Sequence, residues 1–139
     1  MATFNKFQKF VGRLGVGEHN LNTHTIKAYL SNAVPSASDD DIKTDLAEIT
    51  PEHGYPDGGV DIENTYSEVA GVGTVYGVDK VITAAGGTVG PFQYVVLYND
   101  DHASDALIAW LDYGVAVTLN DGETFTIDFD VSGAVFTVT

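Results

Sequence analysis

The chain has 139 residues, of which 44% are hydrophobic, and its formal net charge is −14. This length fits one domain, and the apolar content can fill a core, which argues against disorder throughout the chain. The negative charge argues against direct nucleic-acid binding, because phosphates need many Lys and Arg contacts. The absence of cysteine excludes disulfides, thiolate nucleophiles and cysteine-bound zinc.

The charge is unevenly distributed, since residues 1–43 carry a formal +1 and residues 44–139 carry −15. Such an asymmetry can orient a protein on a charged partner. No stretch approaches the roughly 18 apolar residues of a membrane span. No apolar run follows the basic residues near the N-terminus either, so we expect neither membrane association nor a secretory signal.

Residues 4–14 place Phe4, Phe7, Val11 and Leu14 at helical spacing, before a glycine that can end a helix. The pattern predicts a short amphipathic helix. Packing on the domain's own sheet is the commoner role of such a stripe, and docking on another subunit is the alternative. For docking, we expect the partner-binding residues to be the aromatic and basic side chains Phe4, Lys6, Phe7, Lys9, Phe10 and Arg13. We therefore divide the chain into an N-terminal arm or helix, residues 1–20, and a single β-sandwich-like domain, residues 21–139.

The first expected strand is 25–31, where apolar and polar residues alternate as in a half-buried strand. Residues 32–64 contain three prolines and a triple Asp, which predicts a long loop with one helical turn in 40–49. Loops of this length in small domains are often functional or cover a partner.

From residue 65 onward the pattern is β. Weak strands are expected at 65–69 and 73–78, and a short one at 80–84. The segments 91–98 and 107–113 are apolar on both faces, which predicts central strands.

The last part of the chain contains the strongest turn signal. Residues 115–120 and 123–130 alternate around Asp121-Gly122, a pair that favours a type I′ hairpin turn. We therefore predict a hairpin there, followed by a final strand at 134–138. Short strands at this spacing, without crossover helices, predict a mainly β fold, an antiparallel β-sandwich or small barrel-like domain with a short N-terminal helix.

No catalytic or metal-binding motif stands out. His19 and His24 lie five residues apart, which is not the spacing of a helical metal site, and the serines lack a hydrolase context. The carboxylates Asp128 and Asp130 share an outward strand face. A solvent-exposed charged face is the commoner interpretation of such a pair, and a glycosidase pair is the alternative. Loop oxygens at 39–41 and 99–101 could bind calcium but match no calcium-loop pattern. We therefore expect no enzyme activity, no catalytic residues, no metal and no cofactor.

Several segments together resemble a known group of proteins. These are the segments His19-Asn20-Leu21, Gly54-Tyr55-Pro56-Asp57-Gly58-Gly59, PFQYVVLYND (91–100), LIAWLDYG (107–114) and TLNDGETFTIDFD (118–130). They resemble small virion structural proteins encoded by tailed bacteriophages, over nearly the whole chain. The ordered set from Tyr94 to Asp130 is the specific part of this resemblance.

The resemblance implies a structural role on a virus particle. The first expectation is a capsid decoration or cement protein that binds the major capsid protein shell and stabilises the assembled head. It would form a homo-oligomer, a trimer rather than a dimer, on the capsid surface of the virion after synthesis in the host cytoplasm. The alternative is a tail or fibre component that binds carbohydrate or a host receptor through its many tyrosines and Trp110.

Overall fold

The computed structural model describes residues 2–139, whose regular elements are mainly antiparallel strands. The elements in chain order are β1 (Thr3–Lys6), α1 (Gln8–Gly15), β2 (Ile26–Ser31), the 3-10 helix η1 (Lys43–Asp45), β3 (Val60–Asp61), β4 (Thr65–Val69), β5 (Val72–Tyr76), β6 (Lys80–Thr83), β7 (Val89–Asn99), β8 (Leu107–Leu119), β9 (Thr124–Ile127) and β10 (Ala134–Val138). The expected fold class, mainly antiparallel β with a short N-terminal helix, is confirmed. No helix within residues 2–139 is long and apolar enough to cross a membrane.

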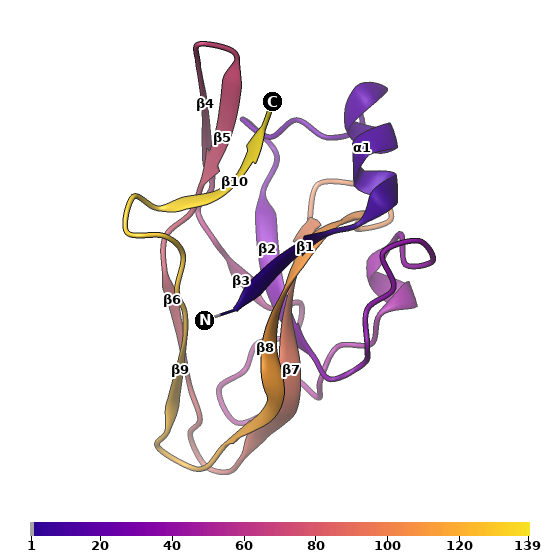
Figure 1. Cartoon of the computed structure of the whole chain (residues 1–139). Helices are drawn as coiled ribbons and strands as arrows, with labels where there is room; N and C mark the ends of the chain where they lie inside the picture. Colours follow the sequence, from indigo (N-terminus) through magenta and orange to yellow (C-terminus); the bar gives the residue numbers. More distant parts are fainter. Residues whose placement is uncertain (1) are drawn as a thin grey trace.

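Three sheets build the molecule. The largest has the strand order β1-β8-β7-β2-β3, and the smaller ones have the orders β10-β5-β4 and β6-β9. In Figure 1 the two small sheets lie on one side of the large sheet, and the loop between β2 and β3 lies on the other side. Across the described part of the chain the sheets remain open and sandwich-like, without closing into a barrel.

The large sheet is buried on both faces. One face packs against the small sheets in a cluster that includes Phe92, Val95 and Ile127. The other face packs under the β2–β3 loop in a second cluster that includes Tyr29 and Tyr98. The prediction of central strands at 91–98 and 107–113 is therefore confirmed, because β7 and β8 are each flanked by strands on both sides. The prediction that 25–31 is only half-buried is wrong, since the β2–β3 loop covers its second face.

The predicted hairpin around Asp121-Gly122 is wrong. The strand before the turn is the end of β8, which pairs with β7, and the strand after it is β9, which pairs with β6. The turn itself exists, since the N–H of Glu123 donates to the carbonyl of Asn120 over 2.9 Å. Only Gly122 has a positive φ, of 88°. This is the pattern of a type II turn, which splays the strands, so the chain crosses to the other layer instead of folding back.

The predicted helix over 4–14 is only partly correct, because the chain is extended up to Phe7 and α1 begins at Gln8. β1 extends the large sheet by pairing with β8, with Phe4 opposite Leu111. The extended start sends Phe7 to one face of the large sheet, and α1 carries Phe10 to the other. Residues 3–15 thus pack on the sheet of the same domain, through β1 beside β8 and through the buried rings of Phe7 and Phe10.

We expect the substitution Phe7→Ala to destabilise the protein by about 3–5 kcal/mol, because it removes a fully buried ring from the second cluster and leaves a cavity. The ring centroid of Phe7 lies 4.7 Å from that of Trp110, so the indole would lose its neighbour. Urea unfolding measures the change. Phe4→Ala is the matched control, since Phe4 is 40% exposed and should cost far less. A loss below about 1 kcal/mol for Phe7→Ala would show that this segment does not support the core.

Candidate functional site

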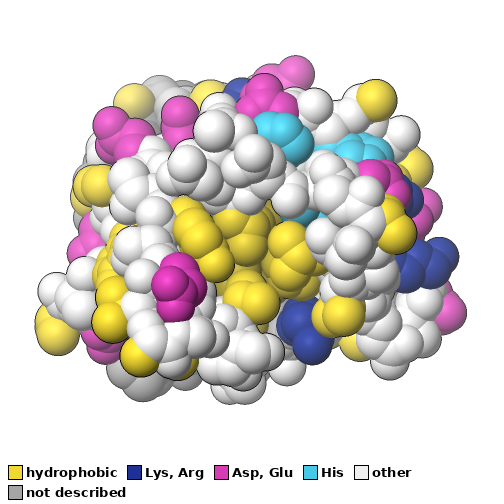
Figure 2. Space-filling model, turned by 90° about the horizontal axis from the view of Figure 1, so that it is seen from above, with side chains coloured by type: hydrophobic (Ala, Val, Ile, Leu, Met, Phe, Trp, Pro, Cys, Tyr) yellow, Lys and Arg dark blue, Asp and Glu magenta, His cyan; other side chains and the backbone are white. Residues whose placement is uncertain are grey.

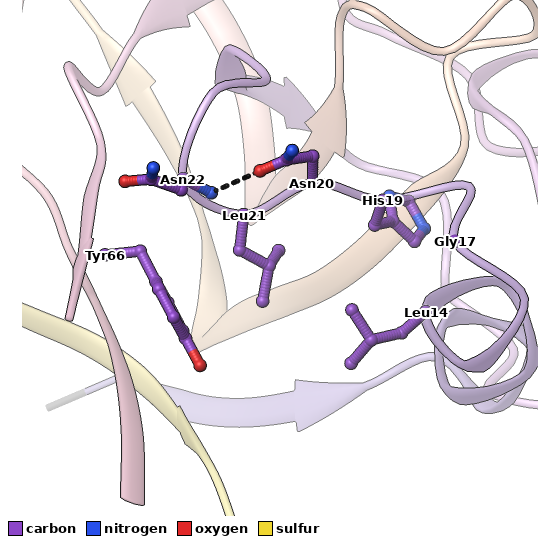
Figure 3. A pocket seen from close by; sticks show the side chains of 7 residues that line it. All are labelled: Leu14, Gly17, His19, Asn20, Leu21, Asn22 and Tyr66. Carbon is purple, nitrogen blue, oxygen red and sulfur yellow. Dashed lines mark hydrogen bonds between the residues drawn. The ribbon is translucent and has the colours of Figure 1, made fainter. Parts of the chain in front are cut away.

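Two hollows on the surface of residues 2–139 are described by their position. The apical pocket, of about 340 Å³, lies at the end of the molecule where α1 and β4 stand. Its lining residues are Leu14, Gly17, His19, Asn20, Leu21, Asn22 and Tyr66. Figure 3 shows Leu14, Leu21 and Tyr66 surrounding an apolar space, with the two asparagines at its rim. Seen from above, the hydrophobic side chains line a hollow and histidines lie beside it (Figure 2).

The buried side chain of Asn99 connects two histidines near the apical pocket. It is 1% exposed at the end of β7, and its Nδ2 lies 3.0 Å from His19 Nδ1 and 2.9 Å from His24 Nδ1. The amide orientation is fixed, because Asn99 Oδ1 accepts a hydrogen bond from the N–H of Asp101. One buried amide thus joins two histidines that sequence spacing did not connect.

This arrangement determines the tautomer of His19. An amide nitrogen can only donate, so His19 Nδ1 accepts and the proton of the neutral ring lies on Nε2. Within residues 2–139 no acceptor reaches that buried Nε2. Burial, together with the charges of the neighbouring His102 and Arg13, lowers the pKa of His19 from 6.5 to about 4. His19 is therefore neutral at pH 7.

A charged cluster lies next to these histidines and ties three loops to α1. Arg13 donates two hydrogen bonds to Asp41, of 2.9 and 2.7 Å, and a third to Glu18 over 2.6 Å. Glu18 in turn lies 2.8 Å from Nε2 of His102. The hydrogen bond to Arg13 lowers the pKa of Asp41, and that to His102 lowers the pKa of Glu18. These contacts fix the loops around the pocket rather than leaving charged groups free.

The apical pocket lacks the parts of a catalytic centre. Its lining contains one histidine but no carboxylate, serine or lysine, so it offers no paired acid and base and no activated nucleophile. Nor do three His, Asp or Glu side chains converge as metal ligands in the described residues. The absence of catalytic and metal-binding residues stays a prediction.

The second hollow, the side groove, lies between the two layers of the sandwich and has a volume of about 500 Å³. Its lining comes from β1, β8 and the β9–β10 region, namely Ala2, Phe4, Leu111, Tyr113, Thr126, Asp128, Phe129, Asp130, Ala134 and Val135. Its lining is therefore mainly apolar, and the two carboxylates that share a strand face in the sequence lie on its wall. Burial, together with the charge of Asp128, raises the pKa of Tyr113 to about 12.

Two strand edges border the side groove. β1 is the outermost strand of the large sheet and β10 is the outermost strand of its small sheet. Their aromatic side chains bridge the layers, since the rings of Phe4 and Phe136 stack with centroids 5.9 Å apart. No strand of residues 2–139 pairs with the outer side of either one. Unpaired edges beside an apolar groove are a surface suited to another polypeptide.

The structure separates the six predicted partner-binding residues into two groups. Phe7 and Phe10 are buried in the core, and Arg13 is bound to Asp41 and Glu18. Phe4, Lys6 and Lys9 are exposed on the surface. Of these, Phe4 lines the side groove, together with the carboxylates Asp128 and Asp130. Sequence reasoning missed the groove because its residues come from both ends of the chain.

Comparisons of the chain with protein-family models, with curated proteins and with solved structures gave no match. The fold and the two hollows are therefore the observations from which a function has to be argued.

We expect acid to destabilise the protein through His19. Its folded pKa of about 4 lies below the unfolded value of 6.5, so the unfolded state takes up the proton first. The stability that the neutral, buried His19 contributes is fully present above pH 6.5 and is lost as the pH falls toward 4. The free energy of unfolding should therefore decrease by about 2 kcal/mol between pH 7 and pH 5. Urea unfolding at the two pH values measures it.

The variant His19→Gln should remove most of this pH dependence. His53→Gln is the control, because His53 lies on another loop, hydrogen-bonded to the carbonyl of Thr88, and does not join the network around Asn99. An unchanged pH dependence in His19→Gln would show that another group is responsible.

Proposed function

We propose that the protein is a non-enzymatic structural component of a tailed-bacteriophage virion, a decoration or cement protein that binds the major capsid protein shell and stabilises the assembled head. The observation that carries the proposal is the side groove, an apolar channel bordered by two unpaired strand edges. Such a surface fits a protein partner, because it offers backbone pairing and apolar contact along a strand edge, and two carboxylates, Asp128 and Asp130, for charged contacts.

The charge of the chain supports this role. With a net charge of −14, copies crowded on a particle repel one another and stay dispersed until they bind the shell. A protein that binds only the assembled state of a shell stabilises that state by mass action. The resemblance of residues 94–130 to small virion proteins of tailed phages agrees with such a role. A symmetric homo-oligomer, a trimer, would multiply the number of contacts with the shell.

The alternative, a carbohydrate-binding or receptor-binding part of a tail or fibre, is less well supported. It needs an exposed aromatic face, yet Tyr55, Tyr94 and Tyr98 are at most 6% exposed. The hydroxyl of Tyr98 donates to the carbonyl of Gly58, and that of Tyr55 donates to Glu48. These rings are used in the core and in holding the β2–β3 loop. Tyr66, Tyr76, Tyr113 and Trp110 are partly buried, so no tyrosine or tryptophan of residues 2–139 presents a largely exposed ring to a sugar.

The test is binding of the purified protein to phage particles that lack it. We expect binding to saturate at a fixed ratio to the shell subunits, electron microscopy to place the protein on the head, and decorated heads to release DNA at a higher temperature. Glycan-array binding, or a location on the tail, would contradict the proposal and favour the alternative.

A single substitution in the side groove should weaken particle binding without unfolding the protein. Phe4→Ser removes an exposed ring of the groove without changing its charge and should reduce the affinity at least tenfold, since aromatic anchors carry much of an interface's energy. Val34→Ser is the matched control, because Val34 is 80% exposed on the β2–β3 loop, on the other side of the large sheet. Equal particle binding by the two variants would show that the groove is not the docking surface. Removal of residues 1–14 is unsuitable as a test, because it also removes Phe7 and Phe10 from the core.

A further inference from the structure

We propose that the side groove binds an extended segment of the partner by strand addition to β1, and that this segment presents an apolar side chain flanked by Lys or Arg to the groove. The inference rests on the proposed function for the identity of the partner, a protein of the particle. The recognition chemistry itself follows from the backbone of β1, the apolar lining and the carboxylates of the wall.

The free backbone groups of β1 can be assigned from its pairing. The N–H of Phe7 donates to the carbonyl of Ile108 over 3.1 Å, so Phe7 and Ile108 form a hydrogen-bonded pair. Such pairs alternate along an antiparallel ladder, which makes Asn5 and Thr3 the next residues bonded to β8. The N–H and C=O groups of Phe4 and Lys6 therefore point away from β8. They form a short template for one further strand.

β1 is a better template than β10. The register between β10 and β5 shifts between Ala134 and Phe136, and a bulge of this kind twists an edge away from regular pairing. β1 pairs with β8 in continuous register over Thr3–Lys6. Beyond this strand the N–H of Gln8 is bonded to the carbonyl of Ala37, which ends the template. The added strand would thus be short, and its side chains would have to supply the specificity.

The side chains that enter the groove follow from the alternation of strands. Phe4 and Lys6 lie opposite Leu111 and Ala109, which belong to the cluster between the layers, so they share that face. Every second residue of an added strand would lie on the same face, above Phe4, Leu111 and Phe129 in the groove. In Figure 1 β1 lies in front of β8, with β9 and β10 to its left. Residues of these four elements and of the β9–β10 connection line the groove.

The charges select the occupant. Asp128 and Asp130 lie on the groove wall, and residues 44–139, which supply most of the wall, carry a formal charge of −15. In the groove, a second copy of this chain would bring its own acidic surface against Asp128 and Asp130 and be repelled, so the proposed trimer would form through another surface, whereas a basic segment would be attracted. The occupant is therefore a basic, partly apolar segment of a different protein.

A seven-residue peptide tests the inference directly. Acetyl-Thr-Lys-Thr-Leu-Thr-Lys-Thr-amide places Lys, Leu and Lys on one face of a strand, with β-favouring threonines between them. Titrated into the full chain, it should shift the amide NMR signals of β1, β9 and β10. The peptide with Glu in place of Lys should bind at least tenfold more weakly. Equal binding of the two peptides would overturn the inference.

Two pairs of variants locate the peptide. Lys6→Pro removes the outward N–H without touching the bonds to β8 and should abolish binding, while Lys6→Ala keeps that N–H and should bind. Asp128→Lys should weaken binding by roughly tenfold, because it replaces an attraction with a repulsion. Asp57→Lys changes the charge equally, but Asp57 is exposed beside β3, at the opposite edge of the sheet, and the variant should bind within twofold of the unchanged protein.

The outcomes separate this inference from the proposed function. Peptide or particle binding that survives both Lys6→Pro and Asp128→Lys, with the fold intact by thermal unfolding, overturns strand addition and leaves the decoration role standing. Peptide binding as described, without any binding to particles, supports the groove's chemistry and overturns the decoration role. A dimer of the free chain that Lys6→Pro dissociates would identify a second copy as the occupant and overturn the inference.

Discussion

Burial of β7 on both faces is the constraint on which the rest of the structure depends. Six consecutive residues, 94–99, are buried. Because successive side chains of a strand point to opposite faces, both faces of β7 need an apolar layer packed against them. One sheet face receives the two small sheets, and the other can be covered only by the segment between β2 and β3, because the remaining strands already belong to the first layer. The length of that segment, which looks excessive for a connection, is therefore that of a structural layer, with Leu46 buried in its cluster.

A loop can serve as a layer only if its polar groups and those beneath it are paired. The hydroxyl of Tyr29 donates to the carbonyl of Leu46, and that of Ser31 donates to Ala47. The loop approaches β2 so closely that a Cβ on Gly59, whose φ is +79°, would overlap the carbonyl of Ala28. This explains why a glycine occupies position 59, and it shows that the end of the Gly54-Tyr55-Pro56-Asp57-Gly58-Gly59 segment packs directly on β2. The β2–β3 loop, whose length suggested a functional role in the sequence, therefore serves to cover one face of the sheet.

The sequence predicted the elements well where one local rule decided them. The doubly apolar strands, the final strand and the inward Phe125, Ile127 and Phe129 all follow from side-chain patterns, and all are found. It failed where a tertiary contact overrode the local rule. The spacing of Phe4 and Phe7 suits a helix, but pairing with β8 makes the segment extended. The side groove and the network around Asn99 join residues from distant parts of the chain, and no spacing within one segment contains that information.

The N-terminal segment shows how one short stretch serves two purposes. Because β1 is extended, its side chains alternate between faces, and α1 then turns its own aromatic residue inward. Phe7 and Phe10 stabilise the core on opposite sides of the large sheet, while Phe4 stays 40% exposed at the groove. A partner that pairs with β1 would therefore bind a strand whose position is already fixed by buried rings, and little conformational entropy would be lost on binding. Strand addition to a preformed edge needs that rigidity, since a mobile arm would have to be ordered at the same time as its partner.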